Sequence, residues 1–219
     1  MPPLSVRPIR PDARQPYPPR RGNGLWESAV HAWSGLIHTV VQQRNMRIHV
    51  AAGILVGLVG SGIPLGLAEK VTLIFCVLLI FFAEILNSAL EQLVDLAVKE
   101  VHEDARGTKD AAAAGVLVLA IGTVVIFIAI LVHNWEAVVS HRPQILRQVV
   151  FGVPLTVTAA LLMMPHRKSA TADALLFSFG CALLAVLAVS STSYAFTAMT
   201  FGLLVVAADS ARVRRKSVP

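Results

Sequence analysis

The chain has 219 residues, of which 55% are hydrophobic and 15% are charged, and its mean hydropathy is +0.67. Charged residues normally make up about a quarter of a soluble domain, so this composition excludes most soluble classes and predicts an all-α integral membrane protein. Lysine and arginine number 19, and aspartate and glutamate 13. In so apolar a chain this basic excess predicts contact with anionic membrane lipids and no nucleic-acid binding.

The N-terminal segment changes character at residue 25. Residues 1–21 hold seven prolines and five arginines and lack an apolar run, so residues 1–24 are predicted to form a disordered basic arm. From residue 25 to about residue 47, apolar side chains recur every three or four positions, which predicts an amphipathic helix. Its apolar face carries Trp26 and Trp33. Because tryptophan favours the head-group boundary, we expect this helix to lie in the membrane surface.

Six apolar runs follow and predict six membrane spans. Basic residues are concentrated in the loops on the same side as the N-terminal arm, so the positive-inside rule places both termini in the cytoplasm. In the first run Gly53 and Gly57 form a GxxxG pair, which permits close packing of another helix. The predicted spans are 48–67, 71–98, 111–132, 149–164, 174–189 and 195–208.

A polar stripe runs along the second half of the second predicted span. Its members recur at helical spacing, so all five fall within an arc of roughly 100°. A carboxylate inside a membrane helix costs about 2.5 to 3.5 kcal/mol on insertion scales, so it is retained mainly where it meets a partner, a metal or a substrate. The stripe consists of Glu84, Asn87, Ser88, Glu91 and Asp95.

The charged loop at residues 99–110 follows this stripe, and Lys109 and Asp110 open the next predicted span. One cation and several carboxylates would then surround an interfacial pocket. Phosphoryl transfer needs carboxylates to hold Mg²⁺, a cation to neutralise phosphate and one carboxylate to accept a proton. The sequence contains no GxxxxGK[ST] loop, so membrane helices would have to bind any nucleotide.

Three segments resemble the prokaryotic diacylglycerol kinase and undecaprenol kinase family of integral-membrane lipid kinases. They are the Arg-Asn-Met-Arg-Ile-His segment at 44–49, the segment 84–91 with Asp95 one turn later, and the segment from His102 to Asp110. The resemblance covers about residues 25–132. It implies a surface helix followed by three spans, a homotrimer with active sites between subunits, MgATP as the phosphoryl donor, and a place in the bacterial inner (cytoplasmic) membrane.

The resemblance also implies roles for individual residues. Glu84 would be the general base on the lipid hydroxyl, and Glu91 would bind the metal and ATP, with Asn87 and Asp95 in support. The residues expected to contact ATP are Glu91, Glu100, His102, Lys109 and Asp110. The family usually has a second metal-binding glutamate where this chain has Gln43. An amide oxygen still coordinates Mg²⁺ but brings no charge.

We therefore expect an ATP-dependent kinase that phosphorylates undecaprenol or diacylglycerol to its monophosphate. Residues 25–135 would form the kinase domain, and residues 136–219 a three-helix membrane region of unknown role. Two alternatives differ in class. One is a non-catalytic membrane relative that serves as a scaffold, and the other is an ion-coupled transporter that uses Glu84 and Glu91 as a relay.

Overall fold

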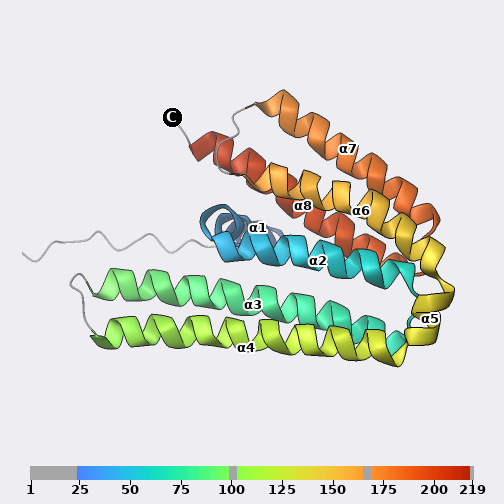
Figure 1. The fold of residues 1–219 in the computed structure, drawn as a ribbon. Helices are drawn as coiled ribbons and strands as arrows, with labels where there is room; N and C mark the ends of the chain where they lie inside the picture. Colours follow the sequence, from blue (N-terminus) through green and yellow to red (C-terminus); the bar gives the residue numbers. More distant parts are fainter. Residues whose placement is uncertain (1–23, 99–102, 165–168, 218–219) are drawn as a thin grey trace, which may run out of the picture.

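The computed structural model describes residues 24–98, 103–164 and 169–217, so the predicted basic arm lies almost wholly outside the described residues. Every regular element in these ranges is a helix, which confirms the predicted all-α class. The helices, labelled in Figure 1, are α1 (Leu25–Gln42), α2 (Arg44–Gly62), α3 (Leu67–Ala97), α4 (Glu103–His133), α5 (Trp135–Ser140), α6 (Arg142–Met163), α7 (Ala170–Val189) and α8 (Tyr194–Ser217).

The chain is a multi-pass membrane protein. Within the described ranges, five helices are long and apolar enough to cross a bilayer, namely α3, α4, α6, α7 and α8. They correspond to five of the six predicted spans. The first predicted span corresponds to α2, which is not among the five but lies alongside α3 in Figure 1. The crossing by α2 stays a prediction.

The predicted amphipathic helix ends earlier than the sequence pattern indicates. It stops at Gln42, and Gln43 adopts an extended backbone (φ −92°, ψ 123°) before α2 begins at Arg44. The Arg47 guanidinium donates back to the Val41 carbonyl oxygen at 3.1 Å, which satisfies one of the carbonyls that a helix end leaves unpaired. The break lets α1 lie steeply across α2, and α1 is seen nearly end-on in Figure 1.

Helices α3 and α4 form a long antiparallel hairpin (Figure 1). Each has 31 residues, so at 1.5 Å per residue each extends about 46 Å and exceeds the roughly 30 Å hydrocarbon core. At the start of α3, the Glu69 carboxylate accepts a hydrogen bond from the Gly66 backbone N–H at 2.8 Å and another from Asn134 Nδ2 at 2.6 Å. These contacts join the start of α3 to the end of α4. The end of the bundle where they lie is called the far end below.

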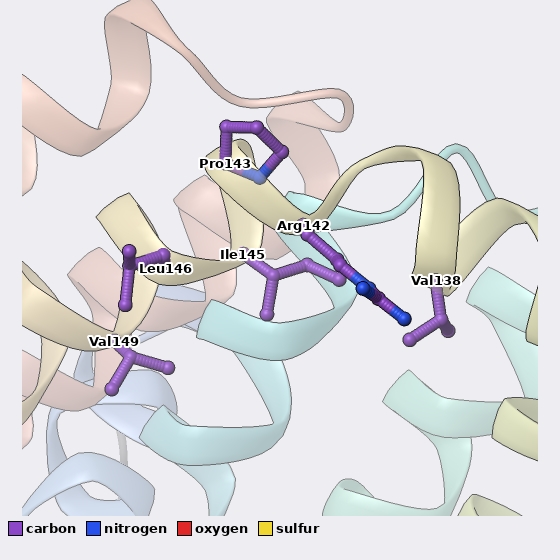
Figure 2. Close-up of a pocket in the computed structure, with 6 residues that line it drawn as sticks. All are labelled: Val138, Arg142, Pro143, Ile145, Leu146 and Val149. Atoms are coloured by element: carbon purple, nitrogen blue, oxygen red, sulfur yellow. The ribbon is translucent and has the colours of Figure 1, made fainter.

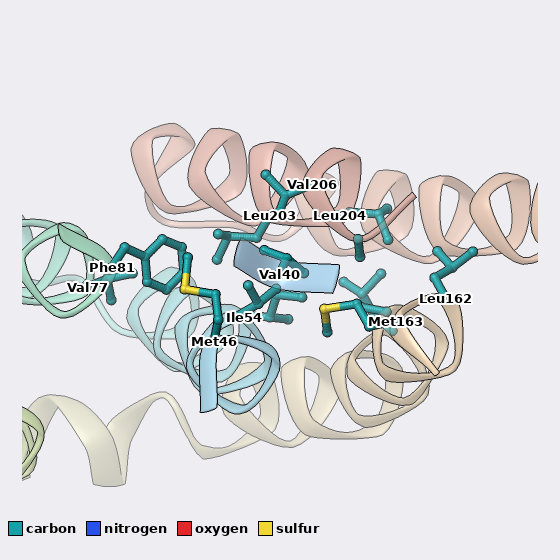
Figure 3. Close-up of a cluster of buried hydrophobic side chains, with 14 of the residues drawn as sticks. Val40, Met46, Ile54, Val77, Phe81, Leu162, Met163, Leu203, Leu204 and Val206 are labelled. Carbon is teal, nitrogen blue, oxygen red and sulfur yellow. The ribbon is translucent and has the colours of Figure 1, made fainter. Parts of the chain in front are cut away.

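The main hydrophobic core joins the N-terminal and C-terminal helices. Figure 3 shows its side chains converging from α1, α2, α3, α6 and α8, among them Val40, Ile54, Phe81, Leu162 and Leu204. Leu184 and Leu187 of α7 belong to the same cluster. Helices on both sides of residue 135 therefore share one core.

Helix α8 packs against the small-residue face of α2. A Cβ added at Gly57 would overlap Thr200 Oγ1, and one added at Gly60 would lie 2.6 Å from the Phe196 ring. Glycine is needed at both positions because the helices approach so closely. Gly53, the other member of the GxxxG pair, also faces α8, because a Cβ there would lie 3.0 Å from Leu203 Cδ1. The GxxxG pair is thus a packing surface, and its partner is a helix of the same chain.

Polar contacts fix the opposite end of α8. Arg215 pairs with Asp173 of α7, and Arg214 donates to the Leu162 carbonyl oxygen at the end of α6, at 2.9 Å. Asp209 accepts from Trp33 Nε1 of α1 at 2.9 Å. Helix α8 therefore holds α1 as well as α2.

Candidate active site between α2, α3 and α4

The polar stripe of α3 is buried at its centre and exposed at its end. Glu84 is 1% exposed, Ser88 2% and Asn87 6%, whereas the Asp95 side chain is 68% exposed. Eleven residues separate Glu84 from Asp95, which is about 16 Å along the helix. The end of the bundle that contains Asp95 and Gln43 is called the site end below. The stripe therefore leads from exposed charge at the site end into the apolar interior.

Glu84 lines a pocket of about 200 Å³ between α2, α3 and α4. Helices α2 and α4 both pack against α3, and their facing side chains form the walls. Among the residues that the structure describes, neither carboxylate oxygen of Glu84 has a hydrogen-bond partner. Buried carboxylates are normally paired or hydrogen-bonded. The pocket lining consists of Asn45, Ile48, His49, Glu84, Asn87, Ala113, Val116, Leu117 and Ala120.

Two amide side chains contact the carboxylate of Glu91. Gln43 Nε2 lies 3.3 Å from Glu91 Oε2, and Asn87 Nδ2 lies 3.1 Å from Glu91 Oε1. The structure therefore brings the two predicted metal ligands together across the break between α1 and α2. Asn87 also lines the Glu84 pocket, so one residue links the two carboxylates.

This group suits a hard divalent ion in donor type but is short of charge. A half-turn of either amide presents an oxygen in place of the NH₂ group, and Mg²⁺ is commonly held by one or two carboxylates completed by water and substrate phosphates. Within the described ranges, no three His, Cys, Asp or Glu side chains are grouped as a metal site would require. The residues fit Mg²⁺ as a partial site that nucleotide phosphates would complete.

Lys109 lies at the exposed end of the stripe. Its Nζ is 2.5 Å from Asp95 Oδ1, so the predicted cation does face the acidic residues of α3. Asp110 instead pairs with Arg106 at 3.8 Å, and both of those side chains are mostly exposed. Glu100 and His102, predicted to contact ATP, lie outside the described residues.

Sequence reasoning missed the two walls of the Glu84 pocket. Asn45 and His49 come from α2, one turn apart, and Ala113, Val116 and Ala120 come from one face of α4. The first two belong to the 44–49 segment that carries the family resemblance. The alanines offered only the general signal that small residues permit close approach.

Another pocket, which is apolar and has a volume of about 560 Å³, lies at the far end, beside α5 and α6. Figure 2 shows Arg142 extending towards Val138 across it, with Ile145, Leu146 and Val149 on the α6 side. No carboxylate lines this pocket, so it lacks the groups that phosphoryl transfer requires.

Comparisons with known proteins point to one family. The profile of the prokaryotic diacylglycerol kinases matches residues 30–131. A diacylglycerol kinase from Synechocystis is 36% identical over 125 residues, which are 57% of this chain and 69% of that relative. An undecaprenol kinase from Bacillus subtilis is 35% identical over 99 residues, which are 45% of this chain and 80% of the relative.

The diacylglycerol kinase of Escherichia coli K12 is 31% identical over 99 residues, covering 45% of this chain and 81% of the relative. No solved structure is detectably similar to the chain. The family profile ends at residue 131, two residues before the end of α4. Helices α5 to α8 therefore lie beyond the profile.

Proposed function

Because the chain belongs to the prokaryotic diacylglycerol kinase family and is therefore a membrane lipid kinase with ATP as a substrate, we propose that it phosphorylates a lipid alcohol, undecaprenol or diacylglycerol, with Glu84 as the general base. The observation that carries this proposal is the burial of Glu84 beside a pocket with both oxygens unpartnered in the described structure. A lipid hydroxyl in that pocket would supply the missing hydrogen bond.

The reaction that we propose is a direct transfer. The acceptor hydroxyl loses its proton to a Glu84 oxygen as its own oxygen bonds to the γ-phosphorus of ATP. The bond from that phosphorus to the bridging oxygen breaks, and ADP leaves with the electron pair. The burial of Glu84 beside a pocket at the inner end of the stripe supports this role, because a membrane lipid could bring its hydroxyl to that pocket.

The other predicted residues would act on ATP. Glu91 and Gln43 would hold Mg²⁺, which when bound supplies positive charge to the phosphate oxygens. Asn87 would orient Glu91, with which it is already hydrogen-bonded. Lys109 would neutralise phosphate charge and is held at the stripe by Asp95. Asp110, Glu100 and His102 are proposed to line the nucleotide site.

We also propose that the protein lies in the bacterial cytoplasmic membrane with both termini inside and works as a homotrimer. The exposed end of the stripe would then face cytoplasmic ATP. Most apolar side chains of α4, among them Val118, Val125 and Val132, are exposed in the single chain. This helix therefore has surface free for lipid or for another copy.

The test is transfer of labelled γ-phosphate from ATP to undecaprenol and diacylglycerol, supplied in parallel with Mg²⁺. Phosphorylation of either lipid supports the proposal, and lipid-independent hydrolysis or no reaction favours a non-catalytic relative. Ion flux in vesicles that depends on Glu84, without lipid phosphorylation, would favour the transporter.

Glu84→Gln keeps the shape of the side chain and removes the proton acceptor. We expect turnover to fall by roughly 10² to 10⁴, the usual contribution of a general base, while the Kd for ATP changes little. Glu136→Gln, in α5, is the matched control and should keep full turnover. Near-normal turnover in Glu84→Gln would remove Glu84 from the mechanism.

A further inference from the structure

The pocket of about 560 Å³ at the far end lies where α5 meets α6, in the part of the chain beyond the family profile. We call it the elbow groove, and its lining consists of Val138, Arg142, Pro143, Ile145, Leu146 and Val149 (Figure 2). The turn between the two helices is held by side chains. His141 Nδ1 lies 2.9 Å from the Ala137 carbonyl oxygen, and Gln144 donates to the Ser190 carbonyl oxygen. The groove is therefore preformed.

The walls of the elbow groove are apolar and lie open to the surroundings of the molecule. Val138 and Ile145 pack against the small core cluster that contains Phe196. Leu146 is 64% exposed and Val149 47%, so the part of the chain that the structure describes leaves them uncovered. A volume of about 560 Å³ is typical of pockets that hold small molecules. A hydrocarbon chain therefore has room to enter the groove.

The elbow groove spans the boundary between head groups and hydrocarbon. Trp135, three residues before Val138 in α5, is 61% exposed, and exposed tryptophan is typical of the membrane–water interface. From Arg142 to Val149, α6 advances seven residues, or about 10 Å, to the start of the predicted span 149–164. The charged end of the groove therefore lies at the level of the head groups, and its apolar walls lead into the bilayer.

Arg142 is the charged member of this lining. It has no acidic partner among the residues that the structure describes, and its side chain extends across the groove in Figure 2. A guanidinium binds phosphate through two parallel hydrogen bonds. In a zwitterionic head group an ammonium ion already neutralises the phosphate, whereas the phosphate of an anionic phospholipid lacks such a partner. Charge complementarity therefore favours an anionic lipid.

We infer that the elbow groove binds one anionic phospholipid, with its phosphate on Arg142 and the first part of an acyl chain along Val138, Leu146 and Val149. With both termini inside, as proposed, this lipid belongs to the outer leaflet. It covers apolar side chains of α5 and α6 together and so braces the turn that connects the profile-matching helices to the C-terminal ones. Binding does not require Glu84, so this inference and the proposed function are tested separately.

The first test measures lipid binding to the full-length protein in detergent by native mass spectrometry. Phosphatidylglycerol and phosphatidylcholine with the same acyl chains are compared. We expect one phosphatidylglycerol to be retained per chain, with a Kd at least about tenfold below that of phosphatidylcholine, which corresponds to roughly 1.4 kcal/mol. Equal Kd values for the two lipids would overturn the inference. Equally tight binding of free glycerol 3-phosphate would overturn it as well, because a soluble anion does not need the apolar walls.

The second test removes the charge. Arg142→Gln should raise the Kd for phosphatidylglycerol by at least about tenfold, and Arg142→Lys, which keeps the charge, should retain most of the preference. The matched control is Arg147→Gln, at an exposed position of α6 outside the lining, which should change this Kd less than about twofold. Equal losses in Arg142→Gln and Arg147→Gln would overturn the inference, since general surface charge would then hold the lipid.

The third test fills the apolar part of the groove. Val149→Phe places a ring in the lining and should also weaken phosphatidylglycerol binding, although Arg142 is intact. Val150→Phe adds the same ring to a position that is 55% exposed and outside the lining, and it should bind the lipid normally. Both positions face outwards enough for either variant to fold, which equal thermal midpoints without lipid would verify. Undiminished binding by Val149→Phe would overturn the placement of the acyl chain.

Discussion

Gln43 contacts Glu91 through an amide nitrogen at 3.3 Å, at the position where the family resemblance led us to expect a carboxylate. If the two side chains share Mg²⁺, the site has one negative charge fewer than a pair of glutamates would supply. Gln43→Glu restores that charge, and hard divalent ions prefer charged oxygen ligands. We expect the Mg²⁺ concentration for half-maximal activity to fall by at least about tenfold, or roughly 1.4 kcal/mol.

Gln42→Glu is the matched control, because Gln42 is exposed next to the break and should leave the Mg²⁺ titration unchanged. Direct Mn²⁺ binding, followed by electron paramagnetic resonance, provides a second measurement that does not depend on turnover. Identical titrations for Gln43→Glu and the original protein would show that Gln43 is not a metal ligand.

Lys109 of α4 joins the ends of α3 and α4 through its ion pair with Asp95 of α3. The two side chains are 34% and 68% exposed, so the pair contributes at most about 1 kcal/mol to stability. Loss of a charge-assisted contact to phosphate is more costly. Lys109→Ala should therefore raise KM for ATP by at least about tenfold, while the thermal midpoint falls by no more than about 4 °C.

Arg106→Ala is the control for this substitution, because Arg106 pairs with Asp110 at 3.8 Å on the exposed surface of α4. It should alter KM for ATP less than about twofold. Equal effects of the two substitutions would indicate that general positive charge near α4, and not Lys109 in particular, attracts the nucleotide.

The contact between α2 and α8 gives a prediction about packing. Gly60→Leu would place a side chain where the Phe196 ring lies within 2.6 Å of a Cβ. Overpacking of this kind costs about 1 to 3 kcal/mol, so the thermal midpoint in detergent should fall. Gly122→Leu is the control, since no heavy atom lies within 4 Å of a Cβ there. Equal midpoints for the two variants would contradict the close contact.

The ends of the helices show what a sequence pattern predicts and what it does not. Long apolar runs predicted the apolar spans, because their composition alone requires burial in lipid. The break at Gln43 escaped prediction because no glycine or proline marks it and the apolar period continues through it. The Gln43 side chain at the break contacts Glu91, a partner far along the chain that the local pattern does not reveal.

At the scale of the whole molecule, one part of the candidate site could be predicted from the sequence and another part could not. The stripe from Glu84 to Asp95 was readable because one helix carries it. The walls of the Glu84 pocket could not be predicted, because Asn45, His49 and Ala120 become neighbours only when α2 and α4 pack on α3. The partner of the glycine face of α2 was also hidden, because packing of small residues does not specify which helix fits.

Removal of residues 136–219 tests how far the core depends on the C-terminal helices. The truncated chain loses the Phe196 and Leu203 contacts to α2 and the Asp209 contact to Trp33. We expect the thermal midpoint to fall by roughly 10 °C or more, because each kcal/mol lost lowers it by about 2 to 4 °C in a chain of this size.

Coexpression of residues 136–219 as a separate chain should recover part of the lost stability, because the same surfaces are available to each other. Hydrogen exchange at α2 amides would follow the loss and the recovery directly. An unchanged midpoint in the truncated chain would mean that α1 to α4 are stable without the shared core.

Helices α2 and α8 belong to one chain, and this matters when few copies of the protein are present in the membrane. A helix that must find its partner on another molecule loses that partner when copies are few, since association depends on concentration in the plane of the membrane. Here the partner is tethered, so its effective concentration is set by the chain and not by the number of copies. The glycine face of α2 therefore stays covered however sparsely the bilayer is populated.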